Sequence, residues 1–397
     1  MRTLPAALVA LVVATAGCAS AESDSGTDVT APSLSASASG SASASATPTT
    51  TATTSATAPR ATTTTATTST TTRPPTRRTT VAEGLDVPWG LAFLPDGSAL
   101  LTTRDEAQLY QVREGAPPVR LGTIAGVVPG GEGGLLGVTA SPDFASDQTV
   151  YLYFTAGDDN RVVRLTFAGG KASAPKPVLT GIPKARNHNG GRIAFGPDGY
   201  LYVATGDAGD GSAAQDRSSL AGKILRVTRD GKPAPGNPFQ GSPVWSYGHR
   251  NVQGLAWDGT GRLFASEFGQ NTWDELNLIR PGANYGWPEV EGSGGQARFV
   301  DPLRQWATSD SSPSGIAVTA DGTVYMAALR GESLWRVPFR GGQAGEPQRL
   351  LNGEYGRLRD VVVGPDGRLW VITNNTARGT PREGDDRVIV IPEATLR

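Results

Sequence analysis

The sequence predicts an all-β fold, a six-bladed β-propeller with four-stranded antiparallel blades, on the strength of three observations. An apolar strand, an Asp-Gly-type turn and a second apolar strand recur six times beyond residue 80. Further short apolar strands follow these hairpins, and no window shows a sustained helical period. Evenly spaced four-stranded units without helices are typical of a propeller. A β-sandwich, the alternative, explains neither the spacing nor the recurring turn.

The first repeat shows the pattern most clearly. The apolar segment 90–93 is followed by the turn Pro95-Asp96-Gly97 and by Leu100-Leu101. Successive repeats begin 47, 55, 62, 61 and 45 residues apart, at Gly90, Gly137, Arg192, Gly254, Gly315 and Asp360. Each interval is long enough for one propeller blade.

The N-terminal 17 residues are predicted to be a lipoprotein signal peptide. Arg2 precedes an apolar stretch that is too short for a lasting membrane span. The segment 15–18, Thr-Ala-Gly-Cys, resembles a bacterial lipobox, so we expect lipidation of Cys18. The protein would then be exported and held on the outer face of the bacterial cytoplasmic membrane. The alternative is plain secretion after cleavage near Ala19.

Residues 18–80 are rich in Ser, Thr, Ala and Pro and predict a disordered tether. All eight tryptophans lie beyond this stretch, so residues 81–397 form the expected folded domain. The formal net charge of −1 argues against a nucleic-acid partner. We expect membrane contact only through the N-terminal lipid.

Propeller topology predicts where the polar segments meet. The Asp-Gly turns share one face, so the segments before each first strand and after each second strand surround the channel mouth on the other face. Both histidines of the chain, His188 and His249, fall in these segments. So do five arginines and four carboxylates: Arg104, Arg250, Arg330, Arg357, Arg359, Glu132, Asp207, Glu267 and Asp274.

This composition suggests an anionic ligand. Arginine binds carboxylates and phosphates bidentately, although ion pairs between blades are the alternative use of such residues. His188 is a candidate general base, and Gly190 and Gly191 are expected to let a ligand approach the backbone. His249 is expected to be mainly structural. The carboxylates and carbonyls of residues 267–275 suit Ca²⁺.

The folded part resembles the soluble PQQ-dependent glucose/sorbosone and aldose sugar dehydrogenases, which are six-bladed propellers. The resemblance covers nearly all of residues 81–397. It rests on the motifs at residues 87–97, 133–137, 248–255, 274–277, 284–288 and 357–361.

The resemblance implies roles for individual residues. His188 matches the catalytic base, Arg250 and Asn251 match residues that contact the quinone, and Arg357 and Arg359 match the pair that grips the PQQ carboxylates. Glu132 and Arg330 fall at further cofactor positions, Asp274 matches an active-site carboxylate, and the carbonyls of Gly269 and Gln270 match those that hold Ca²⁺. Glu275 and the Tyr285 carbonyl match a second Ca²⁺ site.

The expected function is the oxidation of aldose sugars to lactones by hydride transfer to PQQ, with electrons passing to an external acceptor. Four positions depart from the glucose enzymes: Glu132 stands for Gln, Asn187 for Asp, Arg330 for Lys and Gln270 for Pro. Two alternatives stay open. One is a non-catalytic cell-surface propeller that binds a sugar or an anion, and the other is a metal-dependent lactone hydrolase with Glu132 among its ligands.

Overall fold

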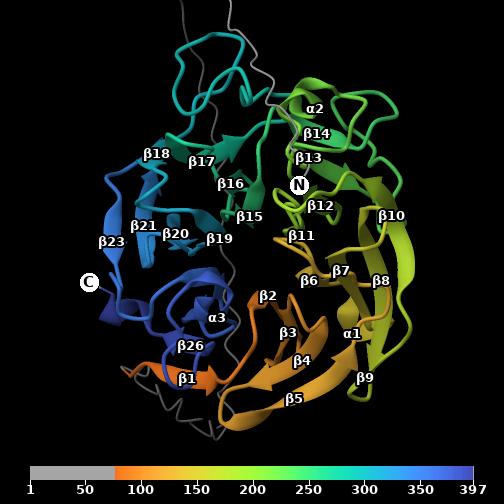
Figure 1. Cartoon of the computed structure of the whole chain (residues 1–397), viewed down its shortest axis with the longest axis vertical. Helices are drawn as coiled ribbons and strands as arrows, with labels where there is room; N and C mark the ends of the chain where they lie inside the picture. The colour runs from red at the N-terminus through yellow and green to blue at the C-terminus, as the bar shows by residue number, and fades with distance from the viewer. Residues whose placement is uncertain (1–76, 397) are drawn as a thin grey trace, which may run out of the picture. The chain divides into compact units, whose positions relative to one another are not determined.

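The computed structural model describes residues 77–396, which form six antiparallel sheets (Figure 1). The predicted signal peptide, Cys18 and the tether as far as residue 76 lie outside the described residues. Within residues 77–396, no helix is long and apolar enough to cross a membrane. The predicted six-bladed propeller is confirmed.

Each blade is a four-stranded meander that runs outward from the centre of the ring. The first blade consists of β2 (Pro88–Phe93), β3 (Ala99–Thr103), β4 (Gln108–Arg113) and β5 (Ala116–Thr123). The second consists of β6 (Leu135–Ala140), β7 (Thr149–Thr155), β8 (Asn160–Ala168) and β10 (Lys176–Ile182). The third consists of β11 (Ile193–Phe195), β12 (Leu201–Ala204), β13 (Lys223–Val227) and β14 (Val244–Tyr247). The next two are β15 (Val252–Trp257), β16 (Leu263–Glu267), β17 (Trp273–Ile279) and β18 (Arg304–Ala307); β19 (Pro313–Val318), β20 (Thr323–Ala328), β21 (Ser333–Arg340) and β23 (Gln348–Leu350). The two-residue strands β9 (Lys171–Ala172) and β22 (Gln343–Ala344) extend the second and fifth blades.

The last blade closes the ring with strands from both ends of the described chain. Its inner strands are β24 (Leu358–Val363), β25 (Leu369–Thr373) and β26 (Val388–Ile391), and its outer strand is β1 (Thr79–Ala82). Thr79 pairs with Val390 and Thr80 with Ile389. Strand β1 therefore begins two residues before the domain boundary predicted at residue 81.

Between residues 77 and 396, three single-turn helices and one 3₁₀ turn interrupt the all-β pattern. They are α1 (Phe144–Asp147), α2 (Gly211–Gln215), α3 (Asn375–Arg378) and η1 (Glu393–Thr395). The expectation of blades without helices was wrong in this detail. A helix of one turn is too short to leave a 3.6-residue period in the sequence.

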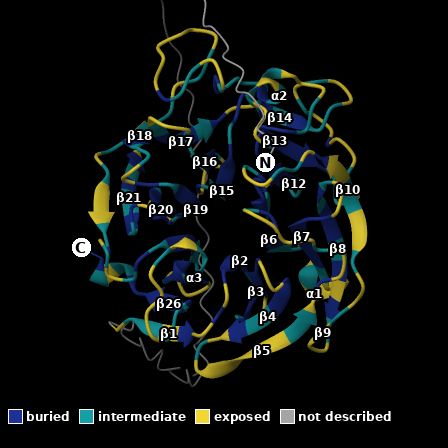
Figure 2. Ribbon diagram, in the orientation of Figure 1, coloured by how far each residue is buried: buried dark blue, intermediate teal, exposed yellow. Residues whose placement is uncertain are grey.

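The core lies between neighbouring blades, and the outermost strands are the most exposed (Figure 2). Leu100 and Leu152 are completely buried in one inter-blade cluster, and full burial of such a side chain is worth about 1.5–3 kcal/mol. Glycines let the innermost strands approach one another. A Cβ at Gly254 would lie 2.4 Å from the Ser314 carbonyl oxygen of the next blade.

Candidate active site

A cavity of about 470 Å³ lies among the loops that precede the innermost strands. All six blades contribute to its wall. The predicted site residues in this wall are Glu132, His188, Arg250, Asn251, Gly269, Arg330, Arg357 and Arg359, together with Arg104. The topology therefore brings together segments that are far apart in the sequence.

His188 lies beside a buried carboxylate. Its Nδ1 is 2.7 Å from Asp207 Oδ1, which also accepts the Gly209 N–H at 2.7 Å. The Trp287 indole donates to the other oxygen, Asp207 Oδ2, at 2.8 Å. Burial opposes ionisation of Asp207, but the bonds from His188, Gly209 and Trp287 outweigh it and lower its pKa. The carboxylate therefore holds the proton on Nδ1 and leaves the Nε2 lone pair for the cavity.

The backbone around His188 is unusual. His188 has a φ of +55°, and its N–H donates to Glu132 Oε2 at 3.0 Å. Glycines follow it because the chain packs tightly against itself: a Cβ at Gly190 would lie 2.6 Å from the Ala204 carbonyl oxygen. The structure gives these glycines a packing role, and their approach to a ligand stays a prediction.

Two arginines of the last blade line the cavity: Arg359 is buried and Arg357 is half-buried. Arg359 is 5% exposed and donates to Gln253 Oε1 at 2.8 Å and to Asn374 Oδ1 at 3.0 Å. Burial lowers the pKa of both Arg357 and Arg359, and nearby cations add to this. Within the part of the chain that the structure describes, the Nε atoms of both side chains have no hydrogen-bond partner. Buried N–H groups of this kind favour an anionic ligand.

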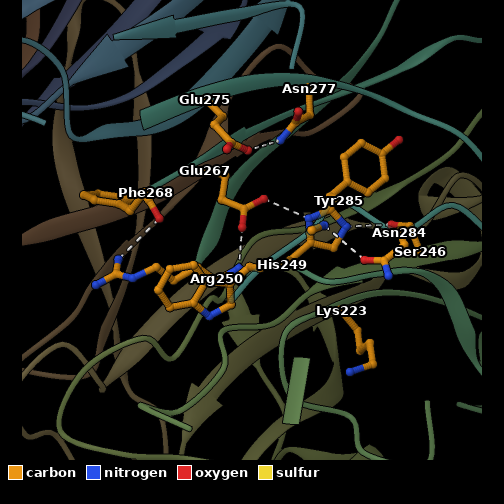
Figure 3. A network of polar contacts seen from close by, with 12 residues as sticks. Lys223, Ser246, His249, Arg250, Glu267, Phe268, Glu275, Asn277, Asn284 and Tyr285 are labelled. Carbon is orange, nitrogen blue, oxygen red and sulfur yellow. Dashed lines mark hydrogen bonds and ion pairs between the residues drawn. The ribbon is translucent and has the colours of Figure 1, made fainter. Parts of the chain in front are cut away.

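Arg250 is held by a buried network (Figure 3). Its backbone N–H donates to Glu267 Oε1, while the other oxygen of Glu267 lies 2.8 Å from His249 Nδ1. Ser246 Oγ lies 2.9 Å from His249 Nε2, and Tyr285 stacks on the His249 ring. His249 is fully buried, which agrees with the structural role expected for it.

The side chain of Arg250 binds the predicted calcium loop itself. Its guanidinium donates to the Gly269 carbonyl at 2.6 Å, and its Nε has no partner. Gln270, the second predicted ligand, is exposed, and its N–H donates to Glu291 at 2.6 Å. A cation at the Gly269 carbonyl would therefore have to displace a guanidinium group.

The second predicted calcium site is a small void of about 10 Å³. Glu275 and Tyr285 line it with Glu267 and Glu291. Burial, together with the charge of Glu267, raises the pKa of Glu275 to about 8. Among residues 77–396, no group of three or more His, Cys, Asp or Glu side chains has a geometry suited to a metal ion.

Asp274 lies behind the cavity wall and is 1% exposed. Its two oxygens accept the N–H groups of Gly269 at 2.9 Å and Ser312 at 2.6 Å. Burial raises its pKa to about 6 despite these bonds. Asp274 ties together two loops that line the cavity.

The other two predicted arginines differ in their surroundings. Arg104 pairs with Asp105 through two contacts, at 2.6 and 3.0 Å. Arg330 is exposed at the rim. Asn251 connects Arg250 to the histidine loop, because its Oδ1 accepts the Gly190 N–H at 3.0 Å.

Sequence reasoning missed several wall residues, among them Trp89, Gln253, Asn374 and Arg378. Trp89 and Gln253 fall within the motifs that carried the family resemblance, and their position beside predicted site residues was a signal. Asn374 and Arg378 follow the second strand of the last blade, where other blades have polar segments. The expectation that segments after each second strand surround the channel mouth, applied to the last blade, would have found both residues.

The base of the cavity is closed by an ion pair across the channel. Arg192 donates to Asp360 Oδ2 at 2.7 Å and to the Gln253 carbonyl at 2.8 Å, and it lies over the Trp89 ring. Arg192 and Asp360 also line a second cavity, of about 510 Å³. These residues separate the two cavities.

The fold and the site define a class of protein: a six-bladed propeller with an axial cavity that pairs a His–Asp couple with guanidinium groups. The chain belongs to the glucose/sorbosone dehydrogenase family, whose model matches residues 85–380. Membership places it among the sugar dehydrogenases, as the sequence motifs predicted.

Individual relatives agree with this assignment. An aldose sugar dehydrogenase of Escherichia coli is 32% identical over 331 residues, which are 74% of this chain and 88% of that protein. The PQQ-bound structure of an aldose sugar dehydrogenase from Streptomyces coelicolor is 56% identical, with a TM-score of 0.76. The alignment covers 80% of this chain and 99% of the Streptomyces coelicolor chain. A glucose dehydrogenase-like structure from a Thermus species is 46% identical, with a TM-score of 0.74, and covers 79% of this chain and 99% of its own.

Proposed function

We propose that this protein is a PQQ-dependent dehydrogenase that oxidises aldose sugars to lactones in the 470 Å³ cavity. One observation carries the proposal: His188, which is held by the buried Asp207, lines the same cavity as three arginines whose Nε atoms have no hydrogen-bond partner among the described residues. The relative from Streptomyces coelicolor with 56% identity, whose structure contains PQQ, supports this choice of cofactor.

The residues of the cavity fit an anionic planar cofactor. Arg250, Arg357 and Arg359 all line the cavity, and their guanidinium groups would donate to its carboxylates or carbonyls. PQQ, when bound, would supply the acceptor of two electrons.

His188 would act as the general base toward the sugar. Its Nε2 takes the proton of the anomeric hydroxyl while the hydrogen at C1 leaves as hydride. Asp207 then stabilises the imidazolium through the Nδ1 hydrogen bond of 2.7 Å. A positioned base of this kind contributes about 10²–10⁴ in rate. Glu132 would accept a hydrogen bond from a sugar hydroxyl beside the base.

Calcium fits the two predicted positions unequally. The void beside Glu275 is lined by the carboxylates of Glu267, Glu275 and Glu291, whose oxygens are of the type that Ca²⁺ prefers, although these side chains are not arranged as a metal site in residues 77–396. At Gly269 and Gln270 the residues do not fit in this arrangement, because Arg250 binds the Gly269 carbonyl. We therefore propose Ca²⁺ at the Glu275 site and take no step of the reaction through a metal.

We also retain the exported location as a proposal. Lipidation of Cys18 would hold the propeller on the outer face of the cytoplasmic membrane, and the Ser/Thr/Ala/Pro-rich segment predicted at residues 18–80 would act as the tether. Metabolic labelling with a radioactive fatty acid, compared between the natural chain and Cys18→Ser, tests it. Equal labelling of the two would contradict it.

The function is tested by loading the full-length protein with PQQ, with and without Ca²⁺, and measuring dye reduction across a panel of aldoses. His188→Ala should lower turnover by about a hundredfold or more while PQQ still binds with unchanged affinity. Absence of both PQQ binding and activity would contradict the proposal. Hydrolysis of lactones without PQQ would instead indicate the hydrolase, and binding without turnover would indicate a binding propeller.

A further inference from the structure

Arg378 is a cavity residue to which no motif of the sequence pointed. It is the last residue of α3, the single helical turn that follows β25 in the closing blade. Its side chain is 63% exposed and lies in the cavity wall together with His188. Arg378 therefore presents a cation to the open part of the site.

The backbone beneath Arg378 is firmly held. The carboxylate of Asp386, which is fully buried, accepts the N–H groups of Asn375 and Thr376 at 2.5 and 3.1 Å. Thr376 Oγ1 accepts the Val87 N–H at 3.0 Å, which ties α3 to the first blade. A long cationic side chain thus extends from a rigid base, an arrangement that reduces the entropy lost when it binds a ligand.

Arg378 makes only a loose ion pair among the described residues. Its guanidinium lies 3.6 Å from Glu132 Oε1, which is longer than a hydrogen bond. The other oxygen of Glu132 accepts the His188 N–H. The donors of Arg378 are therefore available. They lie next to Glu132, which accepts the backbone N–H of the proposed base, His188.

The arginines of the cavity differ in depth. Arg359 is 5% exposed and bonded to its neighbours, as suits a residue that grips a buried cofactor. Arg378 is 63% exposed and lies beside Glu132, whose other oxygen accepts the N–H of the proposed base His188. A substrate that reaches the base therefore comes within range of a mobile cation that no neighbour holds by a hydrogen bond among residues 77–396.

We propose that Arg378 binds the carboxylate of an acidic aldose, a uronic acid, and so sets the substrate class of this site. This inference rests on the proposed function. The planar guanidinium matches a carboxylate with two parallel hydrogen bonds, and Glu132 stays available for a sugar hydroxyl.

The reaction at the anomeric carbon is the same as for a neutral aldose. The C1–H bond breaks with transfer of hydride to the PQQ quinone, and the anomeric proton passes to His188. The ring oxygen stays bonded to C1, so the product is a lactone that keeps the carboxylate of the uronic acid. The two electrons then leave to an artificial dye acceptor.

The test compares D-glucuronate with D-glucose as substrates of the full-length, PQQ-loaded protein. Wild type should show the higher kcat/KM with glucuronate, and this preference should fall as salt is added. Arg378→Gln should lower kcat/KM for glucuronate about tenfold, the size of a partly exposed charge-assisted bond, and change that for glucose less than twofold. Absorbance titration should give the same PQQ affinity for both proteins.

Arg382→Gln is the matched control. Arg382 follows on the same segment, but its guanidinium donates to the carbonyls of Glu354 and Gly353 and not to the cavity. Removing its charge should leave both substrates unaffected. Glu132→Gln should raise activity on glucuronate relative to glucose, because it removes the anion beside the bound carboxylate.

Each other outcome overturns the inference. Equal losses on both sugars, or weaker PQQ binding in Arg378→Gln, would make Arg378 a cofactor residue. Glucose oxidation without a preference for glucuronate would refute the acidic substrate while leaving the proposed function intact. If the protein oxidised neither of these sugars nor any other aldose, both this inference and the proposed function would be refuted.

Discussion

Replacing Asp207 by Asn removes the group that fixes the tautomer of His188. In the natural protein three donors converge on this carboxylate: His188 Nδ1 at 2.7 Å, the Gly209 N–H at 2.7 Å and the Trp287 indole at 2.8 Å. A carboxylate accepts all three, whereas an amide has one oxygen and one donor group. In either orientation, the amide introduced by Asp207→Asn must point its N–H₂ group at a donor.

The two orientations have different consequences for the base. If the amide oxygen faces His188 and Gly209, the amide N–H₂ points at the Trp287 indole N–H. If the amide is reversed, its N–H₂ donates to His188 Nδ1, and the proton moves to Nε2, so the ring no longer accepts a proton from the sugar. We therefore expect turnover to fall by about 10²–10⁴, or about 2.7–5.4 kcal/mol in activation free energy.

The assay is steady-state dye reduction at saturating sugar, together with a PQQ titration of each protein. PQQ affinity should be unchanged, because Asp207 is not in the cavity wall. Trp287→Phe is the control, because it removes one donor and leaves the His188–Asp207 contact. A kcat for Asp207→Asn within threefold of wild type would refute the assignment of His188 as a base held by Asp207.

Two further predictions concern buried groups behind the site. Lys223 is fully buried and donates to three backbone carbonyls at 2.6–3.0 Å, and burial lowers its pKa to about 8 from 10.5. Between pH 8 and pH 10.5 the lysine is protonated in the unfolded chain but largely neutral in the folded protein. The free energy of unfolding therefore rises with pH in this range. The Tm of wild type relative to that of Lys223→Met should therefore rise from pH 7 to pH 10, and a constant difference would contradict this. Glu267→Ala removes the partner of the Arg250 N–H and of His249 Nδ1 and should lower the free energy of unfolding by about 1–3 kcal/mol. Glu267→Gln, which can satisfy both partners if His249 changes tautomer, should cost less in denaturant titrations, and equal losses would count against the network.

Sequence reasoning identified the repeating unit because its signals are local. The Asp-Gly turns and the alternating apolar strands depend on a few consecutive residues, and six repeats of them determine the blade count. Chain direction within a blade then determines which loops meet, and this brought His188, Arg250 and Arg357 into one predicted group. The three residues do line one cavity.

The partners of those residues followed from tertiary structure alone. Whether Asp207 or Asn187 lies beside His188, and whether Arg250 binds a cofactor or the Gly269 carbonyl, depends on the angles between blades and on side-chain rotamers. Neither the angles between blades nor the side-chain rotamers produce a repeating pattern in the sequence. Asp274 was placed in the site by motif, yet it lies behind the wall because its oxygens bind two backbone N–H groups.

The sequence by itself therefore determined the propeller, its blade count and the face that carries the polar loops. Tertiary structure decided that β1 closes the ring, that Asp207 orients His188 and that Arg378 extends over the cavity. Repeats are set by short-range backbone preference, which any window of residues reveals. A side-chain contact between residues tens or hundreds of positions apart exists only once all six blades have packed.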